Sequence, residues 1–164
     1  MEDEAARMEA LGKRFLQGME LKRNGALDDA EDVYRAITRI EPRLAEPHME
    51  LAHILLETDR LGEAEEHARE ALEHLRRGGP WTDDLPAKTV ESMCHALVAE
   101  VLRRRADEDD VIFGDPAVFK KMVDDAKHHF EEAARLDPSD ATASYYATFM
   151  GVPGVVLDAL DEEP

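Results

Sequence analysis

Two pairs of side chains in this chain have the spacing of metal ligands on a helix. Glu50 stands three residues before His53, and Asp125 stands three residues before His128. Residues three apart project from the same face of an α-helix, so each pair can present a carboxylate and an imidazole together. These are ligands that iron accepts, and two such helices would supply part of a dinuclear iron centre.

A ferritin-like di-iron helical protein is therefore one interpretation, but it needs two further carboxylate-bearing helices in a four-helix bundle. The repeat described below favours a stack of helices instead. Four histidines stand on glutamate-rich segments and are expected at the surface, namely His67 and His74 with Glu70 between them, and the adjacent His128 and His129. The sequence thus predicts neither a metal site nor a cofactor.

No arrangement of residues favours catalysis. The sequence contains no glycine-rich phosphate loop and no Gly-x-Ser-x-Gly turn. Cys94 and His95 are neighbours in the chain, so their side chains would diverge on a helix. We therefore expect a protein that is not an enzyme.

Small and apolar residues recur at an interval of 34 residues. Gly18 and Ala52 stand at this interval, and so do Ala30 and Ala64. Such a period is typical of helix pairs that stack, because one pair alone cannot bury its apolar face. A third copy of the second helix contains Ala126, Phe130, Ala133 and Pro138.

At these residues the chain resembles the tetratricopeptide repeat (TPR) family, over about residues 12 to 150. Gln17 and Ile37 depart from the family's usual leucine and alanine. The resemblance implies an all-α, right-handed stack of about three antiparallel helix pairs with a C-terminal capping helix. We expect one domain over 1–164, divided into repeat one (about 11–43), repeat two (45–78), a linker (78–86), repeat three (88–138, with an inserted loop 106–114) and a cap (139–164).

Helix signals agree with this division. Asp115 is expected to cap the helix that follows it, and Asp140 or Ser139 is expected to cap the last helix. Residues 78–80, Gly-Gly-Pro, are a strong helix breaker. The apolar periodicity predicts helices over residues 47–58, 61–77, 88–105, 116–136 and 141–150, and the acidic residues 1–10 can extend the first helix.

The resemblance also implies a binding surface, because the first helices of successive pairs line a concave groove that usually holds a peptide. The alternative is that Phe15, Met19 and Leu56 are buried against the amino-terminal helix or against a second copy of the chain. Nearby acids, including Glu46 and Glu50, would favour a partner with apolar anchors and a basic flank. The projected groove consists of Phe15, Met19, Lys22 and Arg23 from repeat one, Met49, His53 and Leu56 from repeat two, and His95, Ala99 and Leu102 from repeat three.

Three further apolar segments allow two interpretations each. The inserted loop carries Val111, Ile112 and Phe113, which could grip a ligand or fill the gap left by the insertion. Trp81 in the linker is equally ambiguous. The tail at 155–160 is expected to cover the last repeat, and the alternative is that it docks into another molecule.

Composition limits the partners. The formal net charge of −18 argues against nucleic acid and anionic membrane surfaces, which would be repelled. With one cysteine, no secretory signal and no long apolar segment, a cytoplasmic protein is expected. A protein-interaction adaptor is the leading interpretation. The alternatives are a small acidic chaperone for a secreted or assembly-bound protein, and self-assembly into a homo-oligomer.

Overall fold

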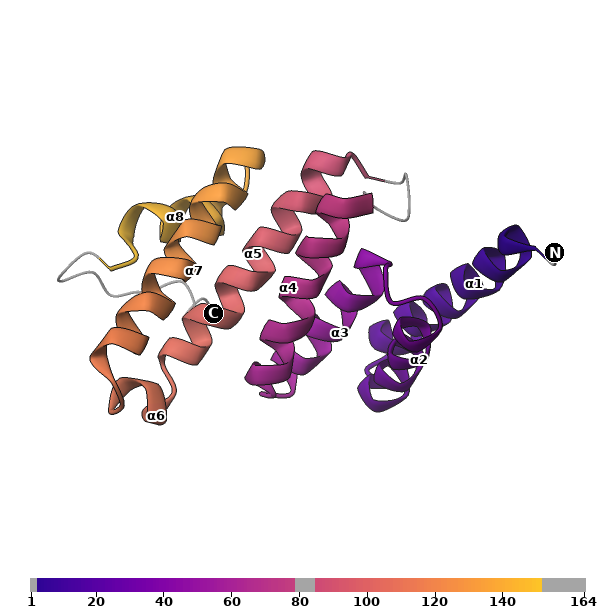
Figure 1. Ribbon diagram of the computed structural model, residues 1–164, viewed down its shortest axis with the longest axis horizontal. Coiled ribbons are helices and arrows are strands. Elements are labelled where there is room, and N and C mark those ends of the chain that lie inside the picture. The colour runs from indigo at the N-terminus through magenta and orange to yellow at the C-terminus, as the bar shows by residue number, and fades with distance from the viewer. Residues whose placement is uncertain (1–2, 79–84, 152–164) are drawn as a thin grey trace.

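Helices account for all regular structure in the computed structural model, which describes residues 3–78 and 85–151 (Figure 1). Eight helices lie in these ranges and pack in sequential antiparallel pairs, without a sheet. They are α1 (Glu4–Arg23), α2 (Leu27–Ile40), α3 (Ala45–Glu57), α4 (Leu61–Gly78), α5 (Ala87–Ala106), α6 (Asp109–Ile112), α7 (Pro116–Leu136) and α8 (Ala141–Phe149).

The helices follow one another along the long axis in chain order, from α1 at one end to α8 at the other (Figure 1). The main pairs are α1 with α2, α3 with α4, and α5 with α7, and α8 packs on α7. Contacts of α2 with α3 and of α4 with α5 join one pair to the next. The short helix α6 lies in the insertion between α5 and α7. Each pair therefore depends on its neighbours for burial of its apolar faces.

The small residues of the 34-residue interval lie where helices approach closely. Ala30, Ala52 and Ala64 are fully buried, and Gly18 is buried as well. A Cβ atom added to Gly18 would stand only 2.8 Å from Cζ of Tyr34 on α2. The absence of a side chain at this position thus allows α1 and α2 to pack around the tyrosine ring.

Two apolar cores share α3. The first core joins α1 and α2 to one face of α3, which contributes Leu51 and Ile54. The second core extends from the other face of α3, with Leu55, through α4, α5 and α7 to α8. Cys94 of α5 lies in this second core, where burial raises the pKa of its thiol to about 12.

The cap predicted at Asp115 is confirmed, and of the two candidates for the last helix the structure uses Asp140 rather than Ser139. Oδ1 of Asp115 accepts a hydrogen bond from the Ala117 amide at 2.9 Å, next to Pro116 at the first position of α7. Oδ1 of Asp140 accepts from the Ala143 amide at 2.9 Å. The acidic start of the chain does extend the first helix, since α1 begins at Glu4.

Two expected segments lie outside the described residues, namely Trp81 within the linker and the tail at 155–160. The expected cap is thus described only as far as residue 151. Within residues 3–78 and 85–151, none of the helices combines the length and the hydropathy that crossing a membrane requires.

Candidate functional site

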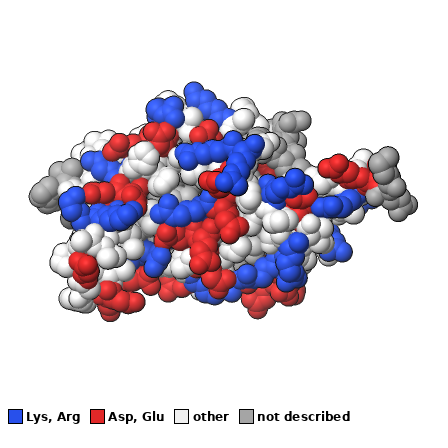
Figure 2. Space-filling model, viewed as in Figure 1, with Lys and Arg blue, Asp and Glu red and all other residues white. Residues whose placement is uncertain are grey.

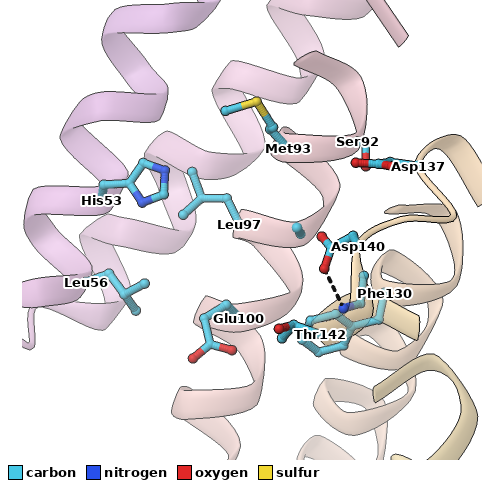
Figure 3. Close-up of a pocket in the computed structure, with 12 residues that line it drawn as sticks. His53, Leu56, Ser92, Met93, Leu97, Glu100, Phe130, Asp137, Asp140 and Thr142 are labelled. Atoms are coloured by element: carbon cyan, nitrogen blue, oxygen red, sulfur yellow. Dashed lines mark hydrogen bonds between the residues drawn. The ribbon is translucent and has the colours of Figure 1, made fainter. Parts of the chain in front are cut away.

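A cavity of about 310 Å³ lies between α3, α5 and the turn that joins α7 to α8 (Figure 3). Figure 3 shows His53 and Leu56 on one side, Asp137, Asp140 and Thr142 on the other, and the residues of α5 between them. The apolar part of the lining consists of Leu56, Met93, Ala96, Leu97, Phe130 and Ala143.

Helical spacing places the lining residues. Met93, Ala96, Leu97 and Glu100 stand at relative positions 0, 3, 4 and 7 of α5 and therefore share one face of that helix. His53 and Leu56 are three apart on α3 and also share a face. The cavity is thus built mainly from two helices that each begin a pair, and it is closed at one end by the start of α8.

Carboxylates stand at the α7–α8 side of the cavity. Oδ1 of Asp137 accepts hydrogen bonds from the amide and hydroxyl of Ser139, and Asp140 is held by its capping bond to the Ala143 amide. Within the described part of the chain, neither carboxylate forms an ion pair with Lys, Arg or His. Hydrogen bonds therefore hold both carboxylates in place, and no cationic side chain of the described residues neutralises them. Glu100, in contrast, accepts two bonds from Arg103, at 3.0 and 2.8 Å.

His53 brings an imidazole to the α3 side. Burial lowers its pKa, and the nearby Lys22 ammonium lowers it further. Lys22 itself forms an ion pair with Glu50 at 2.9 Å, which ties α1 to α3. A neutral imidazole at this position can donate or accept a single hydrogen bond to a bound group.

The groove residues projected from repeats one and two have different surroundings. His53 and Leu56 line the cavity. Phe15 packs edge-on against Tyr34, with ring centroids 5.6 Å apart, and so belongs to the first core. Met49 is buried in the second core, whereas Met19 and Arg23 are exposed on α1.

In repeat three the structure places the projected residues elsewhere. His95, Ala99 and Leu102 are buried in the interior rather than on the groove. The physical reason is a register difference of one residue, which rotates the exposed face by ~100° around a helix with 3.6 residues per turn. The buried small residues give the correct register, because Ala52 and Ala99 stand 47 residues apart and the same interval matches His53 with Glu100.

The inserted loop leaves its apolar residues at the surface. Phe113 is 83% exposed and Ile112 is 47% exposed, while Val111 is partly buried. Phe113 therefore does not fill a gap, which corrects one of the two interpretations of this segment. The loop does not line the cavity between α3, α5 and α8.

The candidate metal pairs of the sequence are not assembled into a dinuclear centre. Glu50 and His53 lie on α3, Asp125 and His128 lie on α7, and α5 packs between these helices. Among the described residues, the cluster with metal-ligand geometry is a different one, formed by His48, His67 and Glu70.

Sequence reasoning missed this cluster because it joins two helices. His48 lies on α3, and His67 and Glu70 lie on α4. His67 and His74, expected at the surface, both stand within ring-stacking distance of the buried His48, with ring centroids 5.3 Å apart in each case. Burial lowers the pKa of both His48 and His67, so neutral imidazoles face each other here. His48 and His67 are 19 residues apart in the sequence, and this interval indicates a contact only when the packing of α3 against α4 is known.

The chain matches no protein-family model, and no curated protein is significantly similar to it.

Proposed function

We propose that this chain is a TPR-like stack of three helix pairs, capped by α8, that binds a peptide segment of another protein and catalyses no reaction. The observation that supports this best is the cavity, which is lined by the first helices of pairs two and three and by α8. In the TPR family, which the chain resembles, the first helices of successive pairs line the concave groove, and the proposal assigns α3 and α5 the same role.

The lining suits an apolar anchor. A cavity of about 310 Å³ is at the small end of the range for ligand sites, so it matches one large side chain of a peptide. Met93 contributes an unbranched, polarizable side chain that adapts to different apolar groups.

The charge at the edge of the cavity determines which residue is favoured next to that anchor in the peptide. Asp137 and Asp140 have no cationic partner in the described part of the chain, and they stand beside the apolar wall. A Lys or Arg next to the anchor would compensate them, whereas an acidic flank would be repelled. The occupant is therefore a segment with an apolar anchor and a basic neighbour.

A displayed peptide library tests this proposal. Selection on the purified chain is expected to enrich peptides that have a large apolar residue beside Lys or Arg. A Leu56→Asp/Met93→Asp variant should bind the enriched peptides ~10-fold more weakly or worse, because it places charge in the apolar wall, and such a loss corresponds to ~1.4 kcal/mol. Fluorescence anisotropy of a labelled peptide measures the change.

The matched control is Leu16→Asp/Ile40→Asp, which also adds two carboxylates, at exposed residues that do not line the cavity. Circular dichroism should give equal helicity for all three proteins. If the Leu56→Asp/Met93→Asp variant binds the enriched peptides as tightly as the control does, the peptides bind elsewhere and the proposal is wrong.

A further inference from the structure

Three metal-ligand atoms meet where α3 packs on α4. His48 lies in the first turn of α3 and is only 3% exposed, while His67 and Glu70 stand one turn apart on α4. The Nδ1 atoms of the two imidazoles are 3.0 Å apart, and Oε2 of Glu70 lies 3.4 Å from Nδ1 of His48. All three ligand atoms lie within 4.8 Å of one another.

The far side of the His48 ring determines which nitrogen carries its proton. Nε2 of His48 lies 2.9 Å from the carbonyl oxygen of Pro42, and a carbonyl oxygen only accepts hydrogen bonds. Nε2 therefore carries the N–H, and in the neutral ring Nδ1 presents a lone pair to His67 and Glu70. Metal-binding histidines are oriented in this way, with the remote N–H donated to a backbone carbonyl.

Hydrogen bonds within the cluster can pair two of the three ligand atoms with each other but leave the third without a donor. A proton on Nδ1 of His67 can bridge the 3.0 Å gap to Nδ1 of His48. The carboxylate of Glu70 then faces the same His48 lone pair with no proton between the two acceptors. A divalent cation among the three atoms would instead accept a lone pair from each.

We propose that His48, His67 and Glu70 bind a divalent transition-metal ion, and that Zn²⁺ is the ion this donor set fits best. Zinc bonds of ~2.0–2.1 Å in a tetrahedron place neighbouring ligand atoms ~3.3 Å apart. The observed separations of 3.0 and 3.4 Å bracket that value. Two imidazoles and one carboxylate are a zinc donor set that leaves a fourth position for water.

The next helix pair contains a comparable histidine pair with the opposite arrangement of protons. Nδ1 of His95 lies 2.9 Å from Nδ1 of His129. Nη2 of Arg76 stands 3.3 Å from Nε2 of His95, and because a guanidinium only donates, Nε2 accepts and Nδ1 carries the proton. Glu91, at 3.8 Å from Nε2, is too distant to accept a hydrogen bond from it. This pair is complete as a hydrogen bond and is a natural control for the first.

The site has a defined place in the molecule. It links the first turn of α3 to the middle of α4, so a bound ion would hold the second helix pair together. The Glu70 side chain is 53% exposed, so the ion has access to solvent through the fourth position. None of the three ligands lines the cavity of the proposed peptide site, so the two proposals can fail separately.

Calorimetric titration of the chelator-treated full chain with Zn²⁺ tests the site. We expect one ion bound per chain with micromolar or tighter affinity, together with a higher midpoint of thermal unfolding. His67→Ala and Glu70→Gln should each weaken binding ~10-fold or more, because even the loss of an outer-shell partner costs 10–100-fold. With Co²⁺ in place of zinc, the wild type should show visible absorption of a tetrahedral site, and Glu70→Gln should alter it.

The matched control is His129→Ala, which removes one imidazole of the hydrogen-bonded pair and should leave zinc binding unchanged. Glu70 is exposed, so Glu70→Gln is not expected to disturb folding, and circular dichroism of the metal-free proteins checks this. The proposal is overturned if the wild type binds no zinc in the micromolar range. It is equally overturned if Glu70→Gln and His67→Ala bind zinc as the wild type does, or if His129→Ala loses it to the same extent.

Discussion

Glu31 accepts several of the hydrogen bonds that join the first two helix pairs. It accepts hydrogen bonds from Arg60, in the turn between α3 and α4, and from Arg35 on its own helix α2, at 2.8 Å. Arg35 also reaches Glu63 on α4 at 2.9 Å. The bonds from Arg60 are the main cause that lowers the pKa of Glu31 to about 2, against the opposing effect of burial.

Glu31→Gln should therefore lower the free energy of unfolding by ~1.5–3 kcal/mol at neutral pH, the range for a hydrogen bond to a charged group. The folded pKa lies below the ordinary value of 4.5, so the contribution is fully present above pH 4.5 and is lost as pH falls from there toward 2. Urea unfolding of wild type and variant at neutral and at acidic pH measures the difference.

Glu73→Gln is the control for that experiment, because among the residues that the structure describes Glu73 pairs just with the exposed Arg77, one turn away on α4. Its effect should be much smaller at every pH. The prediction is wrong if the difference in the free energy of unfolding between wild type and Glu31→Gln is as large at acidic pH as at neutral pH, because the charge of Glu31 would then not contribute to stability.

At the scale of the elements, α3 is the helix that joins the two cores. Ile54 packs toward α1 and α2, and Leu55, the next residue, packs in the core that extends to α8. Both side chains are fully buried. Successive residues on one helix thus belong to different cores, which permits a matched comparison.

Ile54→Ala and Leu55→Ala should each cost ~2–5 kcal/mol, the usual range for emptying a buried position. Hydrogen exchange should separate them: Ile54→Ala should speed exchange most in α1 and α2, and Leu55→Ala most in α5, α7 and α8. Equal acceleration in both regions for both variants would mean that the two cores open only together.

Most elements could be predicted from the sequence, because their signals are local. The 34-residue interval of Gly18 and Ala52 predicts the helix pairs, and Asp115 and Asp140 predict where α7 and α8 begin. The 34-residue interval could not predict which side chains of α5 face the cavity. Extra residues between α4 and α5 lengthen the interval there, so that Ala52 matches Ala99 after 47 residues. The contact of His48 with His67 depends on how two helices dock, and no local spacing encodes it.

At the scale of the whole molecule, the net charge of −18 does not make a uniform surface. Figure 2 shows Lys and Arg side chains interspersed with Asp and Glu over the face in view. Some of these charges are paired between helices, as Arg105 with Glu65 at 2.6 Å. Asp137 and Asp140 are two of the carboxylates that have no cationic partner among the described residues, and their position beside the apolar lining of the cavity distinguishes them from the others.

An Asp137→Asn/Asp140→Asn variant should keep its helix start, because Asn caps as well as Asp does. It should bind peptides with a basic flank more weakly than the wild type does. The difference in affinity between the two proteins should become smaller at high ionic strength, because salt screens the attraction between the wild-type carboxylates and the peptide. Fluorescence anisotropy at low and high salt measures both effects. Peptides with a neutral flank are the control, and an equal loss for them would contradict an electrostatic role of these two residues.

The single cysteine of the sequence is a built-in probe of how often the core around it opens. Cys94 is sealed in the core that runs from α3 to α8, and its high pKa keeps the thiol protonated at neutral pH. A thiol reagent can therefore modify the chain only during the moments when this core opens. The labelling rate of Cys94 thus reports how often this core is open, and it becomes equal to the opening rate when the reagent is concentrated enough to react before the core closes.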